Sequence, residues 1–265
     1  MCQMRRVLRM EKRAFIPTYV VSLADSEARR RRMTLQLSAA GVPFQFFDCV
    51  DGRTQRVPDR IDGARVIRER FRTEGALACT ATHRLLHRMI ADGKADAVLI
   101  LEDDAVIPHD FFDIVEQALT FEFDAFKLEG VNPSNRRITV GRVGGYDVVI
   151  TIRPAVGSAG YILRRDGARR ICSLPVLDWT NDYIFQDTRL RLRVLEMNPF
   201  CVRQDEAIES DMPRSLPISD YVPASRRSVA RLVDSMKRKA MIASIFGATT
   251  LARLELQRIE RWLNR

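Results

Sequence analysis

The chain has 265 residues, of which 46% are hydrophobic and 29% are charged, a composition typical of a soluble globular protein. It has no run of 18 or more apolar residues that would predict a membrane-spanning helix, and its basic N-terminus lacks the apolar segment of a secretory signal. The five cysteines are scattered and form no C-x-x-C pair, which argues against a disulfide framework or a cysteine-based zinc site and favours a reducing cytosol.

The net charge of +9 is concentrated at the two ends of the chain. Residues 1–13 hold five basic residues and one acidic residue, and residues 224–265 hold ten basic and three acidic residues, so the part between them has a net charge of −2. A nucleic-acid-binding domain usually carries its positive charge on the folded reading surface, so this distribution argues against nucleic acid as a partner. The basic ends are better suited to an anionic surface, such as the cytoplasmic face of a membrane.

The beginning of the chain predicts a strand, a helix and a second strand. The β-rich segment 18–23 is followed by a helix that begins at Asp25 or Ser26 and ends at Gly41, and residues 43–50 read as the next strand. Three such elements in so short a stretch are typical of a βαβ unit, in which the two strands are parallel.

A polar segment and a helix come next. Residues 53–72 are rich in arginine and have no clear period, which predicts a loop over one end of the sheet. A helix is predicted over 75–92 with Leu77, Ala81 and Leu85 facing inward, and a buried strand over 97–101.

The remaining elements mix strands and helices. They are a helix capped by Asp110, a strand over 124–130, a hairpin of 138–143 and 146–152, a strand over 157–163, a helix over 164–172, and an extended segment over 192–204. This pattern predicts an α/β fold in which a mixed sheet is sandwiched by helices.

The tail, residues 224–265, predicts a basic amphipathic helical extension with a break at Gly247. The apolar stripe consists of Val229, Leu232, Val233, Met236, Ile245, Thr249, Ala252, Leu256, Ile259 and Leu263. Two roles fit this pattern: a peripheral anchor to anionic lipid, or a helical pair that packs on the body or forms a dimer interface.

Three consecutive carboxylates, Glu102, Asp103 and Asp104, follow the predicted strand 97–101. In open α/β sheets ligands bind beyond the carboxyl ends of the strands. Glu102 and Asp104 point to the same side if the strand conformation continues, and such a pair is suited to a hard divalent cation, Mn²⁺ or Mg²⁺. The competing interpretation is a solvated turn between a strand and a helix.

Several segments in this order resemble glycosyltransferase family 25, the lipooligosaccharide-type sugar transferases. The resemblance is carried by YVVSLADSEARRRRM, FQFFDCVDGR, CTATHRLLHRMI, AVLILEDDAVI, DAFKLEG, GSAGYILRRDGARRI and VLDWTNDYIF, with PFCVRQDEAIES as a closing segment. Together they cover roughly residues 16–212. The resemblance implies a GT-A (Rossmann-like) fold, a nucleotide-sugar donor and transfer with inversion, often of galactose from UDP-galactose.

The resemblance also assigns candidate site residues. Glu102 and Asp104 match the acidic motif that holds the metal, and Asp103 is a candidate to bond the ribose or to orient its neighbours. The candidates for contact with the nucleotide sugar are Ser22, Leu23, Arg29, Arg30, Asp51, His83, Asp103 and Lys127. Solvated arginines and a structural histidine are the competing interpretations of Arg29, Arg30 and His83.

An inverting transfer needs a base that takes the proton of the acceptor hydroxyl. Asp178 aligns with an aspartate in a late loop of the family and is the first candidate, with Asp182 and Glu129 as alternatives. Capping of the segment that follows is the competing role of Asp178, and Trp179 is suited either to stacking on a sugar or to packing in the core.

The sequence therefore predicts a basic extension over 1–15, a catalytic domain over 16–223 and the tail over 224–265. The favoured function is metal-dependent transfer of a hexose from a UDP-sugar to a glycolipid, a lipooligosaccharide or a related surface glycan, at the cytoplasmic membrane face. The alternatives are a non-enzymatic basic α/β protein that binds membrane or nucleic acid, and a degenerate family member that only binds sugar.

Overall fold

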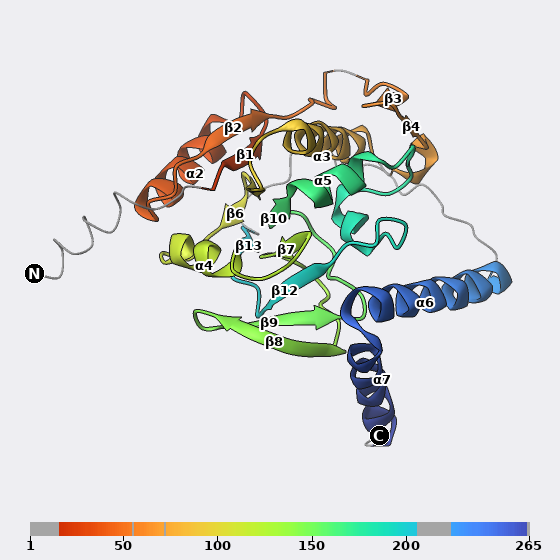
Figure 1. Ribbon diagram of the computed structural model, residues 1–265. Coiled ribbons are helices and arrows are strands. Elements are labelled where there is room, and N and C mark those ends of the chain that lie inside the picture. Colours follow the sequence, from red (N-terminus) through yellow and green to blue (C-terminus); the bar gives the residue numbers. More distant parts are fainter. Residues whose placement is uncertain (1–15, 55, 72, 206–223, 264–265) are drawn as a thin grey trace, which may run out of the picture.

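The computed structural model describes residues 16–54, 56–71, 73–205 and 224–263, so the predicted extension over 1–15 lies outside the described residues. An eight-stranded mixed sheet lies between two layers of helices, which confirms the predicted α/β class (Figure 1). Within the described residues, no helix combines the length and the apolar composition needed to cross a bilayer.

The strand order of the sheet is β2-β1-β5-β10-β7-β12-β9-β8. The strands are β1 (Thr18–Ser22), β2 (Gln45–Asp48), β5 (Ala97–Glu102), β7 (Ala125–Lys127), β8 (Arg137–Val143), β9 (Tyr146–Thr151), β10 (Gly160–Arg164) and β12 (Val194–Asn198). Strands β2, β1 and β5 are parallel, as the predicted βαβ unit requires. β10 is antiparallel to both of its neighbours, β7 and β12 are parallel, and β8 and β9 form the predicted hairpin at one edge.

The central strand β5 buries side chains on both of its faces. Along β5, Leu99 and Leu101 pack with α2 (Glu27–Ala39) and α4 (Phe111–Ala118). The alternate residues Val98 and Ile100 pack with α3 (Glu74–Asp92) and α5 (Arg165–Cys172) on the opposite face. The continuous apolar run of β5 is explained by this two-sided burial, because neighbouring side chains of a strand point to opposite faces.

Helix α3 is correctly predicted, but one of its inward-facing residues is not. Leu77 and Ala81 are buried, whereas the side chain of Leu85 is 43% exposed and Leu86 is buried in its place. Steps of four residues advance by about 400° around an α-helix, so a stripe extended in fours drifts away from the buried face.

The segment predicted as a loop over 53–72 contains regular structure. It forms a hairpin of β3 (Arg60–Ile61) and β4 (Ala64–Val66) and a short 3₁₀ helix, η1 (Arg68–Arg70). β4 also pairs with β11 (Val176–Leu177), which makes a small second sheet. The apolar residues of this hairpin bury against α3, and the many arginines of the segment conceal that short pattern in the sequence.

The late part of the chain includes β11, η2, β12 and β13, and part of it lies near the carboxyl end of β5. Residues 175–182 lead through β11 into a second 3₁₀ helix, η2 (Asn181–Gln186). The extended segment over 192–204 divides into β12 and β13 (Arg203–Gln204), and β13 pairs with β6 (Ala105–Val106) directly after the three carboxylates.

The tail forms two helices, α6 (Ala224–Phe246) and α7 (Ala248–Leu263), with the predicted break at Gly247, whose φ is +89°. They lie beside the β8–β9 hairpin (Figure 1). The residues that pack on the hairpin, at Ile138 and Ile152, are Met241, Ile242 and Leu254.

The buried face of the tail is therefore not the predicted stripe. Val233, Met236, Leu256 and Ile259 belong to that stripe and have side chains between 44% and 63% exposed. The apolar surface at Ile138 and Ile152 is short, so it contacts only part of each tail helix. The other apolar side chains of the two helices stay exposed. The side chains of Val229, Leu232 and Leu263 lie outside the described residues.

Candidate active site

A cavity of about 510 Å³ opens where the parallel strands β1 and β5 end. Eight of the residues proposed from the sequence line it or flank its acidic cluster: Ser22, Leu23, Arg29, Asp51, Glu102, Asp103, Asp104 and Asp182. Strand termini bring them together, because β1 and β5 run in the same direction and finish side by side.

The three carboxylates of this cluster have different surroundings. Asp103 is buried and accepts hydrogen bonds from the Ser22 hydroxyl at 2.6 Å and from the Arg29 guanidinium at 3.1 Å. Asp103 therefore joins the end of β5 to the end of β1 and to α2, which is the orienting role among its two candidate roles.

Asp104 is the carboxylate with the fewest contacts. Its Oδ1 atom is buried and has no hydrogen-bond partner among the described residues, and its Oδ2 atom lies 3.4 Å from the amide nitrogen of Gln204. Burial, together with the negative charges of Glu102 and Asp103, raises the pKa of Asp104 to about 7. A buried carboxylate oxygen without a donor is the arrangement that a cation would satisfy.

Glu102 is held by two side chains from other elements. Its Oε1 atom lies 3.1 Å from His83 Nε2 and accepts a hydrogen bond from the Ser158 hydroxyl at 2.7 Å. Burial by itself would raise the pKa of Glu102, but the hydrogen bond and charge of His83, the Ser158 hydroxyl and the charge of Lys127 together lower it.

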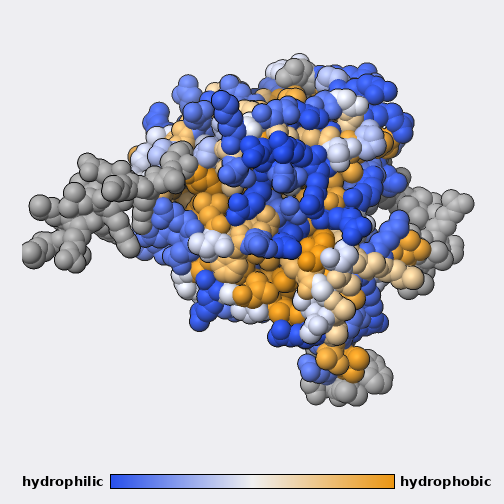
Figure 2. All heavy atoms as spheres, in the orientation of Figure 1, coloured by the Kyte–Doolittle hydropathy of each residue, from blue (hydrophilic) through white to orange (hydrophobic). Residues whose placement is uncertain are grey.

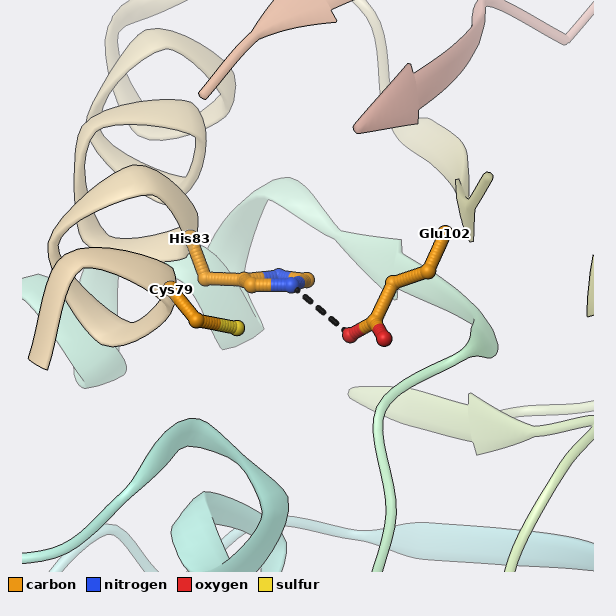
Figure 3. A group of neighbouring side chains, drawn as sticks. All are labelled: Cys79, His83 and Glu102. Carbon is orange, nitrogen blue, oxygen red and sulfur yellow. Dashed lines mark hydrogen bonds and ion pairs between the residues drawn. The ribbon is translucent and has the colours of Figure 1, made fainter. Parts of the chain in front are cut away.

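Cys79, His83 and Glu102 form a second group with metal-binding chemistry. Their ligand atoms all lie within 4.8 Å of one another, and Figure 3 shows both α3 side chains directed toward Glu102. Cys79 also lines the cavity. Burial and the neighbouring carboxylates raise the pKa of its thiol well above the usual range, so the thiol is protonated in the absence of a metal. The carboxylate oxygens of Glu102 and Asp104 are the ligand type that a hard cation prefers, whereas a thiol and an imidazole suit a softer one.

A buried hydrogen-bond chain supports His83 from behind. The Tyr161 hydroxyl lies 2.8 Å from His83 Nδ1 and 2.7 Å from His87 Nε2, and all three side chains are fully or almost fully buried. A hydroxyl has one proton, so Tyr161 donates to one imidazole and accepts from the other. His83 has no exposed surface, and its contact with the cavity passes through Glu102.

Asp182 is the base candidate that lies in the cavity. The Ser158 hydroxyl is 2.9 Å from its Oδ1 atom and also contacts Glu102, so one hydroxyl bridges the two carboxylates. Burial, and next the charge of Glu102, raise the pKa of Asp182. Glu129 lies behind Gly157 and accepts a hydrogen bond from the Ala159 amide at 3.1 Å.

Asp178 lies outside the residues that line the cavity. Its carboxylate pairs with the Arg189 guanidinium at 2.7 Å. The neighbouring Trp179 is half exposed, and its ring lies 6.2 Å from that of Tyr183. This exposed aromatic pair brackets Asp182 in the sequence, with Trp179 just before η2 and Tyr183 on it.

The two arginines predicted for the diphosphate differ in position. Arg29 lines the cavity beside Asp103. Arg30 turns away and donates to the backbone carbonyls of Ser22 and Leu23, at 3.1 and 3.0 Å, and to the carboxylate of Asp48. Arg30 therefore fixes the end of β1.

Lys127 is fully buried, and its ammonium donates to the carbonyl oxygen of Gly157 and lies 5.1 Å from the centre of the Phe185 ring. Burial lowers the pKa of Lys127, while the surrounding carboxylates oppose that effect. Lys127 supports the Gly157 wall of the cavity from behind, and it is not among the lining residues.

Several lining residues were not proposed from the sequence, among them Arg53, Gln204 and Asp205. Arg53 donates to the carboxylates of Asp51 and Asp25 at 2.8 to 3.1 Å, and its hydrogen bonds lower the pKa of Asp51 to about 2. Gln204 and Asp205 approach Asp104 from the end of β13. Their position depends on the pairing of β13 with β6, which no local pattern in the sequence indicates.

The fold is that of an α/β protein with an acidic cavity at the carboxyl ends of its parallel strands. Residues 15–180, more than half of the chain, match glycosyltransferase family 25, described as an LPS biosynthesis protein family. The chain belongs to this family, and it is by membership a glycosyltransferase of the LPS-biosynthesis type.

Curated relatives are similar along most of their length. The lacto-N-neotetraose biosynthesis glycosyltransferase LgtE of Neisseria meningitidis serogroup B is 22% identical over 266 aligned residues, covering 91% of this chain and 93% of the relative. The lipooligosaccharide biosynthesis protein lic2B of Haemophilus influenzae is 19% identical over 242 residues, covering 86% of this chain and 90% of the relative.

Proposed function

We propose that the protein transfers a hexose, with galactose from UDP-galactose as the first candidate, to a lipooligosaccharide or a related surface glycan with inversion at the anomeric carbon. The observation that carries the proposal is that Glu102 and Asp104 line one cavity with Arg29, and that the buried Oδ1 atom of Asp104 has no hydrogen-bond partner among the described residues. The names of the two relatives support the class of acceptor, and the family resemblance supports a GT-A arrangement of donor and sheet.

Glu102 and Asp104 are the residues that would hold Mn²⁺ or Mg²⁺ in this proposal. When bound, such a cation supplies positive charge that stabilises the departing diphosphate. Arg29 would contact the same diphosphate, since its guanidinium fork matches phosphate oxygens. Asp103 keeps Arg29 in place through their contact at 3.1 Å and therefore acts on the donor indirectly.

The nucleoside would lie along the end of β1, between Ser22, Leu23 and the Asp51–Arg53 pair. These residues line the cavity together with the carboxylate cluster, which Ser22 contacts through Asp103. Asp51 accepts hydrogen bonds from Arg53, so the pair offers both charges to the polar groups of a nucleoside.

Asp182 is our proposed base. It lies in the cavity with Glu102, whereas Asp178 pairs with Arg189 outside the lining residues. Asp182 would take the proton of the acceptor hydroxyl, and the Ser158 hydroxyl holds its carboxylate in place at 2.9 Å. The exposed rings of Trp179 and Tyr183 flank Asp182 in the sequence and are suited to stack on a sugar of the acceptor.

The tail is proposed to bring the enzyme to the cytoplasmic membrane face. Exposed apolar side chains of α6 and α7, Val233, Met236, Leu256 and Ile259, share this surface with lysines and arginines. Figure 2 shows hydrophobic surface on both helices. A helix with apolar and basic side chains exposed together binds anionic interfaces.

A screen of UDP-sugars tests the transferase proposal. The full chain is incubated with each UDP-sugar and Mn²⁺, and release of UDP is measured with and without EDTA. We expect metal-dependent release with UDP-galactose, and a loss of release of about 100-fold or more in Asp182→Asn if that residue is the base. Asp92→Asn, at an exposed acid of α3, is the matched control and should behave as wild type.

Three outcomes would contradict parts of the proposal. Full activity of Asp182→Asn together with loss in Asp178→Asn would return the role of base to Asp178. Binding of a UDP-sugar without release of UDP, even with lipooligosaccharide present, would indicate a family member that only binds sugar. Release that EDTA does not change would contradict the metal.

The membrane proposal has its own test in co-sedimentation with anionic vesicles. Met236→Asn with Ile259→Asn changes two exposed tail residues and should reduce binding, while Leu35→Asn changes a side chain of α2 that is 67% exposed and should not. Equal binding of wild type, the Met236/Ile259 double variant and Leu35→Asn would exclude the tail as an anchor.

A further inference from the structure

A second cavity, of about 520 Å³, lies at the other end of the sheet. Four arginines line it, Arg164, Arg170, Arg191 and Arg193, with residues 122–124 and with Ser244 and Ile245 of α6. The strand register separates it from the first cavity, the one lined by Glu102 and Asp104, which we call the donor cavity after the proposed sugar donor. Arg164 is opposite Ala97, where β5 begins, whereas the donor cavity lies beyond Leu101 and Glu102, where β5 ends.

The charges of this cavity are not balanced. Four guanidinium groups face two carboxylates, those of Glu122 and Asp124. Asp124 accepts from Arg170 at 3.1 Å and from the backbone amide of Arg193 at 2.7 Å. Glu122 pairs with Arg193 at 2.5 Å, but the Glu122 side chain is 89% exposed, so solvent screens that pair.

The other two arginines make hydrogen bonds to neutral oxygens. Arg164 donates to the carbonyls of Leu119 and Phe121 at 3.0 and 3.2 Å, and Arg191 donates to the Ser244 hydroxyl at 2.7 Å. These contacts hold the guanidinium groups in position without neutralising their charge. Arg164 is further fixed by the Phe123 ring, whose centre is 4.6 Å from its guanidinium carbon.

We propose that this cavity binds a phosphoryl group, as a phosphate monoester or a diphosphate. Several pre-positioned guanidinium groups around one hollow match the shape and charge of phosphate oxygens better than those of any neutral ligand. Because Ser244 and Ile245 form one wall, the ligand would connect the sheet to the end of α6. Both a soluble phosphate compound and a lipid headgroup carry this chemistry, and the site is independent of the proposed sugar donor.

Calorimetric titration of the full chain with inorganic phosphate and with pyrophosphate tests the site. EDTA is present, so that a metal in the donor cavity does not contribute. We expect the double variant Arg170→Gln with Arg191→Gln to bind at least about tenfold more weakly than wild type. The matched double variant is Arg60→Gln with Arg65→Gln, on the small second sheet. It loses the same net charge but changes no residue that lines the cavity, so it should bind within about twofold of wild type.

Two further variants separate the site from folding and from the donor cavity. Arg191→Gln alone changes one exposed side chain and should weaken binding severalfold while leaving the melting temperature unchanged. Arg29→Gln changes the donor cavity and should leave phosphate binding intact. Phosphate binding that is lost in Arg29→Gln and kept in the Arg170/Arg191 variant would place the ligand in the donor cavity and overturn the proposal.

Vesicles distinguish the two sources of the phosphoryl group. The proteins are sedimented with phosphatidylcholine vesicles that contain or lack phosphatidic acid. If the ligand is a lipid, the Arg170/Arg191 double variant should lose the part of vesicle binding that depends on phosphatidic acid. If the ligand is soluble, wild type and double variant should sediment equally, and the double variant should still bind free phosphate more weakly. If wild type and double variant bind both free phosphate and phosphatidic acid vesicles equally, the cavity is not a phosphoryl site.

Discussion

The Ser22 hydroxyl donates a 2.6 Å hydrogen bond to Asp103, and this contact joins the ends of β1 and β5. It separates the middle carboxylate, Asp103, which has two side-chain donors, from Asp104, whose buried Oδ1 atom has no hydrogen-bond partner among the described residues. All three carboxylates line the cavity. Ser22 and Arg29 thus reduce the free-energy cost of burying the carboxylate of Asp103 beside two others.

Ser22→Ala should destabilise the fold by about 2 kcal/mol, because it leaves a buried carboxylate oxygen of Asp103 without its donor. Urea unfolding followed by circular dichroism measures the loss. Ser173→Ala is the matched control, since the Ser173 hydroxyl donates to the carbonyl of Arg170 at an exposed position. Equal stability of the two variants would show that the Ser22–Asp103 contact contributes nothing.

Asp104→Asn should weaken Mn²⁺ binding by at least about tenfold, because a neutral amide oxygen is a poorer ligand for a hard cation. Calorimetric titration with Mn²⁺ measures the affinity. The melting temperature without metal should not fall, since Asp104 Oδ1 has no hydrogen-bond partner to lose among the described residues. Unchanged Mn²⁺ affinity, with Asp92→Asn as control, would remove Asp104 from the metal site.

Tyr161→Phe should cost about 1–3 kcal/mol of unfolding free energy, because two buried imidazoles lose a shared partner. Burial, and next the positive charges of His83 and Arg84, lower the pKa of His87 well below the usual range, so His87 stays neutral and needs a neutral partner. Tyr146→Phe removes the hydroxyl of a half-buried tyrosine and is the control. A cost no larger than that of the control would mean that water replaces the Tyr161 hydroxyl.

The contribution of Asp62 to stability should depend on pH. Asp62 accepts hydrogen bonds from Arg84 at 2.9 Å and from Arg88 at 2.7 Å. Burial would raise the pKa of Asp62, but these arginines outweigh it and lower the pKa below the ordinary 3.8. A lowered pKa means that the ionised form stabilises the fold above 3.8, and this contribution is lost as the pH falls below that value.

Asp62→Asn should therefore cost about 2 kcal/mol at pH 7, and the difference from wild type should shrink below pH 4. Urea unfolding at several pH values measures both proteins. Asp59→Asn, at an exposed acid of the same segment, should cost less than about 0.5 kcal/mol. A difference for Asp62→Asn that stays constant to pH 2 would contradict the assignment.

Gly157→Ala should destabilise the wall of the donor cavity for two reasons. Its φ of +119° disfavours any side chain, and a Cβ atom would lie 2.5 Å from the Oε2 atom of Glu129. Gly63→Ala has a φ of +77° with open space around it, and Gly145→Ala has open space without that φ. We expect urea unfolding to rank the costs as Gly157 above Gly63 above Gly145, with Gly63→Ala near 1 kcal/mol. Equal costs at 157 and 63 would show that Glu129 moves aside freely.

Most of the sheet was predictable from local patterns. The run of apolar residues over 97–101 predicted a buried strand, which the structure confirms. The strand ends at Glu102, and Asp103 and Asp104 lie in a turn, so the alternation of side chains on which the pair Glu102 and Asp104 was predicted does not continue to Asp104. The ligand site at the strand end stays a prediction. The pairing of β1 with β5 then brought Ser22 and Arg29 to the same place.

The surroundings of the site were not predictable in this way. Asp182 and Asp178 lie four positions apart in one loop, and the sequence ranked Asp178 first, but the path of η2 turns Asp182 into the cavity and leaves Asp178 beside Arg189. Gln204 arrives through a two-residue pairing of β13 with β6. Such contacts join residues far apart in the chain and carry no periodic signal.

The amino-acid sequence by itself determined the alternation of strands and helices, the break at Gly247 and the acidic end of β5, because helix period, strand period and the φ of glycine act over a few residues. Only the tertiary structure decided which carboxylate serves the fold and which face of the tail is buried. It also brought the four arginines of the second cavity together. Burial and charge at these positions depend on neighbours that the chain supplies from a distance, so the same residue type has two side-chain donors at Asp103 and a buried oxygen without a partner among the described residues at Asp104.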